Sequence, residues 1–119
     1  MDKALTGAYG EVIAARFLRD NGYRILDANY RTRLGEIDII ASKRKVIAFV
    51  EVKTRVEGSM LRAADAVDYP KRKRIIATAQ SYISQNKIKL QPRFDVAEVY
   101  VDGLEVKDFN YIENAYDSE

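Results

Sequence analysis

Three ionisable residues, Asp38, Glu51 and Lys53, interrupt or end two apolar runs near the middle of the chain. The runs, at 37–41 and 46–50, are rich in β-branched residues and are separated by polar residues, so they predict the two strands of a hairpin. Ionised side chains are not normally placed in a core strand unless they are paired or bind a cation. The pattern therefore indicates a hairpin that carries a charged site.

The pleat of this hairpin decides whether the three side chains meet. Glu51 and Lys53 are two residues apart, so they point to the same face of their strand. A two-residue turn within 43–45 keeps Asp38 on that face, opposite Phe49 or Glu51, whereas an odd-residue turn directs it to the other face. Cβ atoms of opposite residues lie about 4.5–5.5 Å apart and those of diagonal residues about 7–8 Å, distances that one divalent ion can bridge between two carboxylates.

Composition excludes several kinds of chemistry. The 119 residues contain no Cys and no His, which removes disulfides, thiol catalysis, Ser-His-Asp hydrolysis and the usual zinc enzymes. Carboxylate-rich ion sites are those of Mg²⁺ or Mn²⁺. An apolar content of 47% fits one domain over 1–119, and the sequence shows neither a membrane span nor a signal peptide, so we expect a cytoplasmic protein.

The small net charge hides an asymmetry along the chain. Residues 1–101 hold 19 Lys and Arg against 12 Asp and Glu, whereas residues 102–119 hold one Lys against six acids. The basic part favours a polyanionic partner, although an ordinary solvated surface is also compatible with this excess. The acidic tail, from about residue 104, is expected to form an edge strand with a loose end.

A first helix is predicted over residues 3–21, and Glu11 lies on its apolar stripe with Ala8 and Ala15. Two interpretations stay open for this carboxylate. It either lies at the edge of the stripe, solvated or paired with an Arg, or it joins the charged site as a further carboxylate.

A strand over 23–30 follows, and the polar segment 29–33 leads from it into the hairpin. Arg31 and Arg33 in that segment either contact phosphate or form a solvated loop. After the hairpin we expect a loop at 56–59 and a short helical turn at 63–67.

Pro70 begins a second helix that runs to Asn86. Its first turn contains four consecutive cations: Lys71, Arg72, Lys73 and Arg74. Exposed cations there oppose the helix dipole by about 0.3–1 kcal/mol each, a cost that a bound phosphate backbone would offset. The alternative is a plain solvated face.

The last alternating segment, 93–101, predicts a strand that extends the sheet beside the hairpin, with Asp95 in a salt bridge to an Arg such as Arg93. The order of elements is then helix, three strands, helix, strand and a further edge strand. It predicts an α/β fold with a mixed central sheet flanked by helices.

The chain also resembles a known family. The residues Gly35-Glu36-Ile37-Asp38 and Phe49-Val50-Glu51-Val52-Lys53-Thr54-Arg55 resemble the metal-site pattern of the PD-(D/E)XK nuclease superfamily, in the form found in the YraN-like family of predicted endonucleases. That family is similar to the archaeal Holliday junction resolvases. The resemblance covers most of the chain and also includes Gly10-Glu11, Gly22-Tyr23, Asn29, Lys71, Arg74, Ile75, Ala79, Tyr82 and Arg93-Phe94-Asp95.

The resemblance implies a restriction-endonuclease-like core and a Mg²⁺- or Mn²⁺-dependent endonuclease that hydrolyses DNA, with branched or structured DNA among the candidate substrates. It implies Asp38 and Glu51 as metal ligands, Lys53 beside the attacking water, and Glu11 as an additional ligand. A homodimer is expected from the resemblance alone. The residues expected to contact DNA are Arg31, Arg33, Arg55, Lys71, Arg72 and Arg74.

Two other interpretations of the charged residues remain. Asp38, Glu51 and Lys53 would form a purely structural Lys–carboxylate cluster at a desolvation cost that an apolar core avoids. The second alternative is a nuclease-like module that binds DNA or docks a partner without cutting. In either case the acidic tail is expected to compete with DNA, so truncation after Gly103 should tighten binding.

Overall fold

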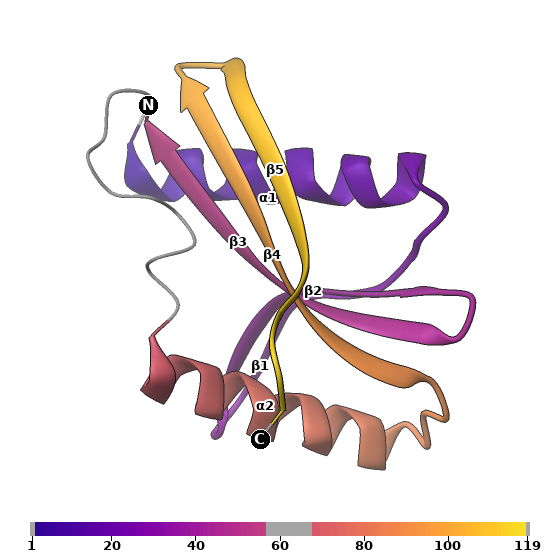
Figure 1. Ribbon diagram of the computed structural model, residues 1–119. Helices are drawn as coiled ribbons and strands as arrows, with labels where there is room; N and C mark the ends of the chain where they lie inside the picture. Colours follow the sequence, from indigo (N-terminus) through magenta and orange to yellow (C-terminus); the bar gives the residue numbers. More distant parts are fainter. Residues whose placement is uncertain (1, 57–67, 119) are drawn as a thin grey trace.

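The computed structural model describes residues 2–56 and 68–118 and contains a five-stranded sheet with two helices (Figure 1). In chain order the elements are α1 (Lys3–Asp20), β1 (Arg24–Thr32), β2 (Gly35–Lys43), β3 (Val46–Val56), α2 (Tyr69–Gln85), β4 (Gln91–Asp102) and β5 (Glu105–Tyr116). The strands lie in sequence order, and only β3 and β4 are parallel. This mixed sheet flanked by helices confirms the predicted α/β class and is compatible with a restriction-endonuclease-like core.

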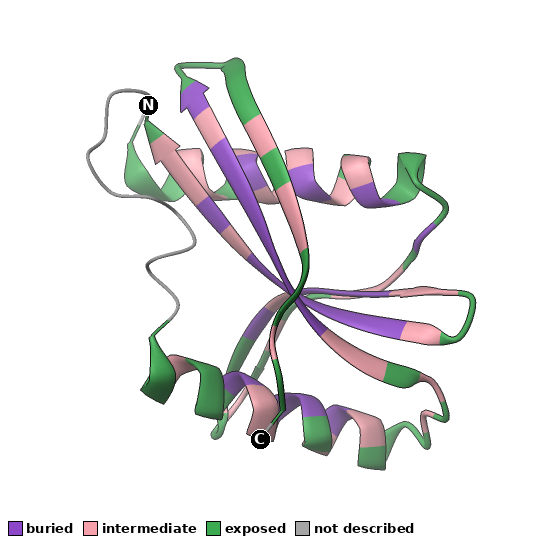
Figure 2. Ribbon diagram, viewed as in Figure 1, coloured by how far each residue is buried: buried purple, intermediate pink, exposed green. Residues whose placement is uncertain are grey.

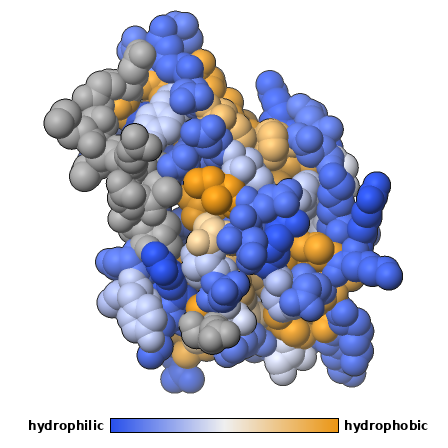
Figure 3. Space-filling view, viewed as in Figure 1, coloured by the Kyte–Doolittle hydropathy of each residue, from blue (hydrophilic) through white to orange (hydrophobic). Residues whose placement is uncertain are grey.

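The two helices lie on opposite faces of the sheet, and each face has its own apolar core (Figures 1 and 2). Along β3, Ala48 and Val50 face α1, whereas Ile47 and Phe49 face α2. Because side chains alternate along a strand, Glu51 and Lys53 continue the face that carries α2. On the face of the molecule in Figure 3, hydrophilic side chains predominate and apolar groups appear as separate patches.

The connection between β3 and β4 brings α2 to the charged residues. Parallel strands require a crossover, and here the crossover contains α2. Asp68 caps α2 by accepting a hydrogen bond from the Lys71 backbone N–H at 2.9 Å. This places the cationic first turn of α2 near the end of β3 that carries Glu51 and Lys53.

The turn between β2 and β3 has two residues, which is the alternative that keeps Asp38 on the face of Glu51 and Lys53. Lys43 pairs with Val46 across the two-residue turn Arg44–Lys45, and the pairing runs on to Ile39 and Val50. Arg44 adopts a positive φ of 54°, which suits a tight hairpin turn. Continued by one residue, this register sets Asp38 opposite Glu51.

Two segments differ from the sequence-based expectation. The polar segment 29–33 was expected to be a connection, but β1 continues to Thr32 and Asn29 lies within it at a φ of 53°. Backbone pairing with β2 outweighs the polar composition, and Asn tolerates positive φ better than most residues. Of the loop predicted at 56–59, Val56 ends β3; the remainder, like the turn at 63–67, lies outside the described residues.

The acidic segment after residue 104 forms the edge strand β5, paired with β4. The ring centroids of its Phe109 and Tyr111 lie 4.8 and 5.1 Å from the ring centroid of Phe17 in α1. Truncation after Gly103 would therefore remove a strand and part of the α1 core, so that experiment does not isolate competition with DNA. Among the described residues, no helix is long and apolar enough to cross a membrane.

Candidate active site

A cleft of about 520 Å³ brings the predicted site residues together. Glu11 comes from α1, Asp38 from β2, and Glu51 and Lys53 from β3. The other lining residues are Lys3, Thr6, Gly7, Val52, Thr54, Arg55, Val56 and Lys71. The cleft therefore joins four elements, α1, β2, β3 and α2, around one cluster of charges.

Glu51 is the most enclosed member of this cluster, with only 6% of the residue exposed. The Lys53 Nζ lies 3.0 Å from Glu51 Oε1, and the Lys71 Nζ forms an ion pair with the same oxygen. Both ammonium groups thus share one carboxylate oxygen. The Lys71–Glu51 contact was missed by the sequence analysis, which assigned Lys71 only to DNA binding.

Asp38 is held at the point where β2 and β3 separate. Its Oδ2 accepts a hydrogen bond of 2.8 Å from the Val52 backbone N–H. Burial, followed by repulsion from Glu51, raises the pKa of Asp38 to about 7, although the Val52 hydrogen bond and Lys71 act in the opposite direction. Near neutral pH this carboxyl group would be stabilised by an additional cation.

Close packing of α1 on β3 positions Glu11. A Cβ at Gly10 would overlap the Thr54 hydroxyl, so only glycine allows the helix to approach this closely. Burial raises the pKa of Glu11, repulsion from Glu36 and Glu51 adds to this effect, and a hydrogen bond from Asn29 opposes it. Glu11 therefore faces the cleft, where it experiences both the carboxylates and the favourable charge of Arg31.

The two lysines have opposite shifts. Burial lowers the pKa of Lys53, and neighbouring Lys71 lowers it further. Burial also opposes the charge of Lys71, but its hydrogen bonds to Glu51 and Lys53 outweigh that effect and raise its pKa. Of the two lysines, Lys71 thus holds its proton more tightly.

The chemistry of the donors fits a magnesium-type ion, which prefers carboxylate oxygens. Among residues 2–56 and 68–118, no three acidic side chains are already arranged to surround one ion. Asp38 and Glu51 are the adjacent pair, and an ion bound to Glu51 would replace ammonium groups at Oε1. Glu11 is a further carboxylate of the same cleft.

The residues predicted to contact DNA occupy different places. Arg55 and Lys71 line the cleft, and Arg31 and Arg74 line a neighbouring hollow together with Lys71. Arg72 instead lies over the Tyr116 ring, 5.4 Å from its centroid. Arg33 is exposed in the turn between β1 and β2 and lines neither cavity.

Two sequence signals would have identified additional cleft residues. Lys3, Gly7 and Glu11 follow at intervals of four, which places them on one face of α1. Lys71 likewise precedes buried Ile75 by four residues, so it lies on the inward face of α2. Helical spacing thus separates Lys71, and Arg74 four residues before buried Thr78, from Arg72 and Lys73.

Comparison with known proteins relates the chain to one family. The chain matches the model of "Uncharacterised protein family UPF0102" over residues 10–99, which include Glu11, Asp38, Glu51 and Lys53. A UPF0102 protein of Caldanaerobacter subterraneus subsp. tengcongensis is 42% identical over 119 residues, covering 98% of each chain. One from Alkaliphilus oremlandii is 48% identical over 113 residues, covering 92% of this chain and 96% of the relative.

Among solved structures, Pyrococcus furiosus SfsA in complex with Ca²⁺ aligns over 94% of this chain, with a TM-score of 0.39 and 16% identity. The chain spans 64% of the length of that SfsA chain, slightly less than two thirds. The family match and the full-length relatives confirm the resemblance found in the sequence: the chain belongs to the UPF0102 family, which is YraN-like.

Proposed function

We propose that this protein is a cytoplasmic, metal-dependent endonuclease that hydrolyses phosphodiester bonds of DNA, with Asp38, Glu51 and Lys53 as its catalytic residues. The observation that carries the proposal is the meeting of these three side chains in one open cleft, with the pKa of Asp38 raised to about 7. Strongly shifted groups in a cleft are typical of functional sites.

The residues match the needs of the reaction. Hydrolysis of a phosphodiester requires an activated water and neutralisation of the charge that develops on the phosphoryl oxygens. Asp38 and Glu51 would hold Mg²⁺ or Mn²⁺, which supplies Lewis-acid chemistry for these tasks when bound. The Lys53 ammonium would orient the water or hold the scissile phosphate, and burial lowers its pKa, which makes its proton easier to transfer.

A purely structural cluster accounts less well for these features. A buried ion pair stabilises a fold only when its geometry is good and its remaining lone pairs are satisfied. Here three carboxylates and three lysines line a cleft of about 520 Å³, and burial, followed by repulsion from Glu51, raises the pKa of Asp38. That arrangement favours binding of a cation over tight internal pairing.

The second candidate function is a nuclease-like module that binds DNA or a partner without cutting. One observation favours it: the Lys53 and Lys71 ammonium groups already neutralise Glu51 Oε1. If these ion pairs persist when DNA is bound, no divalent ion gains access to Glu51. DNA binding would then be indifferent to Mg²⁺ and to replacement of Glu51.

The deciding experiment measures Mn²⁺ and Mg²⁺ binding by calorimetry for the wild type and for Asp38→Asn with Glu51→Gln. Cleavage of linear, flapped and four-way DNA is assayed in parallel. Metal binding that is lost in the variant, together with metal-dependent cutting of any substrate, supports the endonuclease. Absence of metal binding by the wild type, both with and without DNA, supports the non-cutting module.

A homodimer belongs to the same proposal, because two copies would present two clefts to one branched DNA molecule. Sedimentation of the protein with and without a four-way junction tests this point. A single copy bound per junction at saturation would contradict it.

A further inference from the structure

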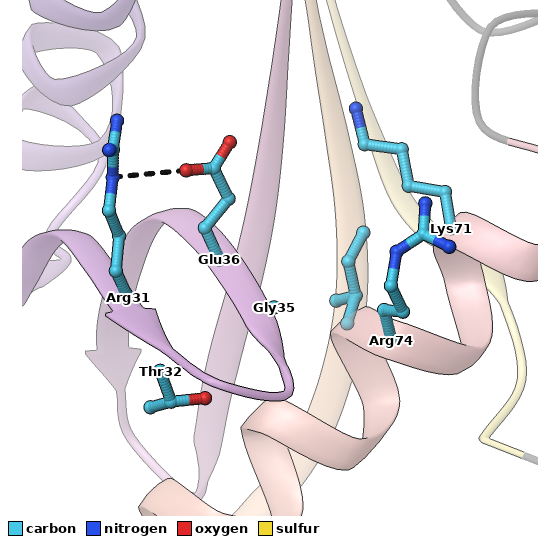
Figure 4. A pocket seen from close by; sticks show the side chains of 7 residues that line it. Arg31, Thr32, Gly35, Glu36, Lys71 and Arg74 are labelled. Carbon is cyan, nitrogen blue, oxygen red and sulfur yellow. Dashed lines mark ion pairs between the residues drawn. The ribbon is translucent and has the colours of Figure 1, made fainter.

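A second hollow opens beside the proposed active site, between the turn that joins β1 to β2 and the N-terminal half of α2 (Figure 4). Its volume is about 300 Å³. Arg31 of β1 and Glu36 of β2 lie on one side, and Lys71 and Arg74 of α2 lie on the other side. The hollow is therefore lined by three cations and one carboxylate, and the carboxylate lies on the same side as Arg31.

The carboxylate of Glu36 leaves most donors of the two arginines available, whereas Lys71 is already paired with Glu51. Glu36 Oε2 lies 3.0 Å from Arg31 Nε, and both side chains are largely exposed. Because a guanidinium has five N–H donors, this contact at Nε leaves the two terminal nitrogens of Arg31 for another anion. Among the described residues, Arg74 forms no ion pair with a carboxylate.

Close packing holds the two sides of the hollow at a fixed separation. A Cβ at Gly35 would lie 3.0 Å from Thr78 Oγ1 and 3.2 Å from Arg74 Cβ, so the turn between β1 and β2 packs directly on α2. Arg31 is thereby presented from a rigid strand and Arg74 from a rigid helix. Two guanidinium groups that face one small space suit a phosphate, which accepts several charge-assisted hydrogen bonds at once.

Lys71 connects this hollow to the active-site cleft, because it lines both. A water molecule takes up about 30 Å³ in the liquid, so a hollow of about 300 Å³ has room for a phosphate group. Because Lys71 lines both cavities, this space adjoins the cleft in which the phosphate to be cleaved would lie at Asp38 and Glu51.

We propose that the hollow is a phosphate-binding subsite, in which Arg31 and Arg74 together hold one backbone phosphate of the DNA strand beside the phosphate to be cleaved. The inference rests on the proposed function, because it takes DNA as the ligand. It adds that the DNA strand is bound on the α2 side of the β1–β2 turn. Exposed Arg33, and Arg72, which lies over the Tyr116 ring, do not hold this phosphate.

The test measures binding of a fluorescein-labelled 30-base-pair duplex over a range of salt concentrations, with Ca²⁺ in place of Mg²⁺. The variants are Arg31→Gln, Arg74→Gln and the double variant. The matched control is Arg19→Gln, which removes the same charge from the exposed far end of α1. Circular dichroism checks that each variant is folded, and cleavage with Mg²⁺ is assayed in parallel.

If both arginines hold one phosphate, the double variant loses about 0.9 from the slope of log K against log salt, the value for one B-DNA phosphate contact. Its affinity loss, about tenfold, is smaller than the product of the two single losses, because the two residues share a ligand. Arg19→Gln leaves the slope unchanged.

An unchanged slope in the double variant overturns the subsite, as does a loss of about 1.8, which would mean two separate phosphates. A shared-phosphate signature without cleavage by the wild type keeps the subsite and rejects the endonuclease. Cleavage by the wild type with an unchanged slope in the double variant keeps the endonuclease and rejects the subsite. A wild type that binds no DNA rejects both the subsite and the endonuclease.

Discussion

Two buried carboxylates on neighbouring strands, Glu51 of β3 and Asp95 of β4, have opposite surroundings. In the parallel register Val50 pairs with Asp95 and Glu51 with Val96, so the two acids are one step apart and face opposite sides of the sheet. Glu51 faces the cleft on the α2 side, whereas Asp95 faces the core beneath α1.

The Asp95 network is closed. Its carboxylate is fully buried and accepts hydrogen bonds from the Arg93 guanidinium, the Tyr111 hydroxyl and the Asn114 backbone N–H. The hydrogen bond from the Asn114 N–H holds Asn114 in its positive-φ conformation. Asn114 lies at the point where the pairing of β4 with β5 is irregular. The predicted salt bridge of Asp95 with Arg93 is therefore present, and its effect is to anchor the edge strand.

The Glu51 cluster is open. Its two carboxylates repel each other, its two lysines share one oxygen, and the group borders a cleft of about 520 Å³. Burial of charge is common to both networks and so does not mark a functional site by itself. What distinguishes them is incomplete internal pairing next to accessible volume, since only such a group gains from binding an ion or a phosphate.

The largest expected difference is in catalysis. Glu51→Gln removes a proposed metal ligand and should slow DNA cleavage at least about 10³-fold, equivalent to roughly 4 kcal/mol of transition-state stabilisation. Single-turnover cleavage with Mg²⁺ measures this effect, and Glu105→Gln, on the exposed edge strand, is the control that should cut at the wild-type rate. A loss of less than tenfold for Glu51→Gln would remove this residue from the reaction.

The closed network should be more sensitive in stability. Asp95→Asn removes the buried charge partner of the Arg93 guanidinium, whose side chain is only 18% exposed, and leaves it the exposed Glu113 carboxylate at 3.7 Å. Breaking such a buried pair should lower the free energy of unfolding by about 3 kcal/mol. Urea denaturation measures the change, and a loss below about 1 kcal/mol would show that the network is not needed for folding.

Asp38→Asn should have the opposite effect on stability. Because the pKa of Asp38 is raised from 3.8 to about 7 in the folded state, the folded protein binds the extra proton and its stability falls as pH rises between these values. The amide removes this dependence and still accepts the Val52 hydrogen bond. We expect a gain of about 2 kcal/mol at pH 8 in EDTA.

Urea denaturation of the wild type and Asp38→Asn between pH 4 and pH 8 measures this difference. Divalent ions should reverse the order of stability at pH 8, because only the wild type offers the second carboxylate. Stability curves that stay parallel over the whole pH range would contradict the raised pKa.

The smallest effect concerns competition between a lysine and the metal. Lys71→Met removes one of the two ammonium groups at Glu51 Oε1, so Mn²⁺ should bind the DNA-free protein about fivefold more tightly, close to 1 kcal/mol. Calorimetry measures this affinity, with Lys73→Met as the control on the same helix turn. Weaker Mn²⁺ binding by Lys71→Met would mean that Lys71 supports the ion and does not compete with it.

The sequence by itself determined the local parts of the site. Alternation placed Glu51 and Lys53 on one face, and it left two positions for Asp38, of which the structure shows the one set by the two-residue turn Arg44–Lys45. Both helices begin and end within one residue of the predicted positions, because caps and apolar spacing act within a few residues along the chain. These features depend on neighbours in sequence, and the sequence contains those neighbours.

Only the tertiary structure decided which distant charges meet. The crossover between β3 and β4 brings Lys71 to Glu51. The turn between β1 and β2 places Arg31 opposite Arg74, and the packing of α2 directs Arg72 toward Tyr116. The run 71–74 appears uniform in sequence, yet the rotation of α2 about its axis gives its members different partners. That rotation is set by the apolar stripe Ile75, Ala79 and Tyr82 seated on the sheet, so long-range packing, and not local charge, assigns each cation its place.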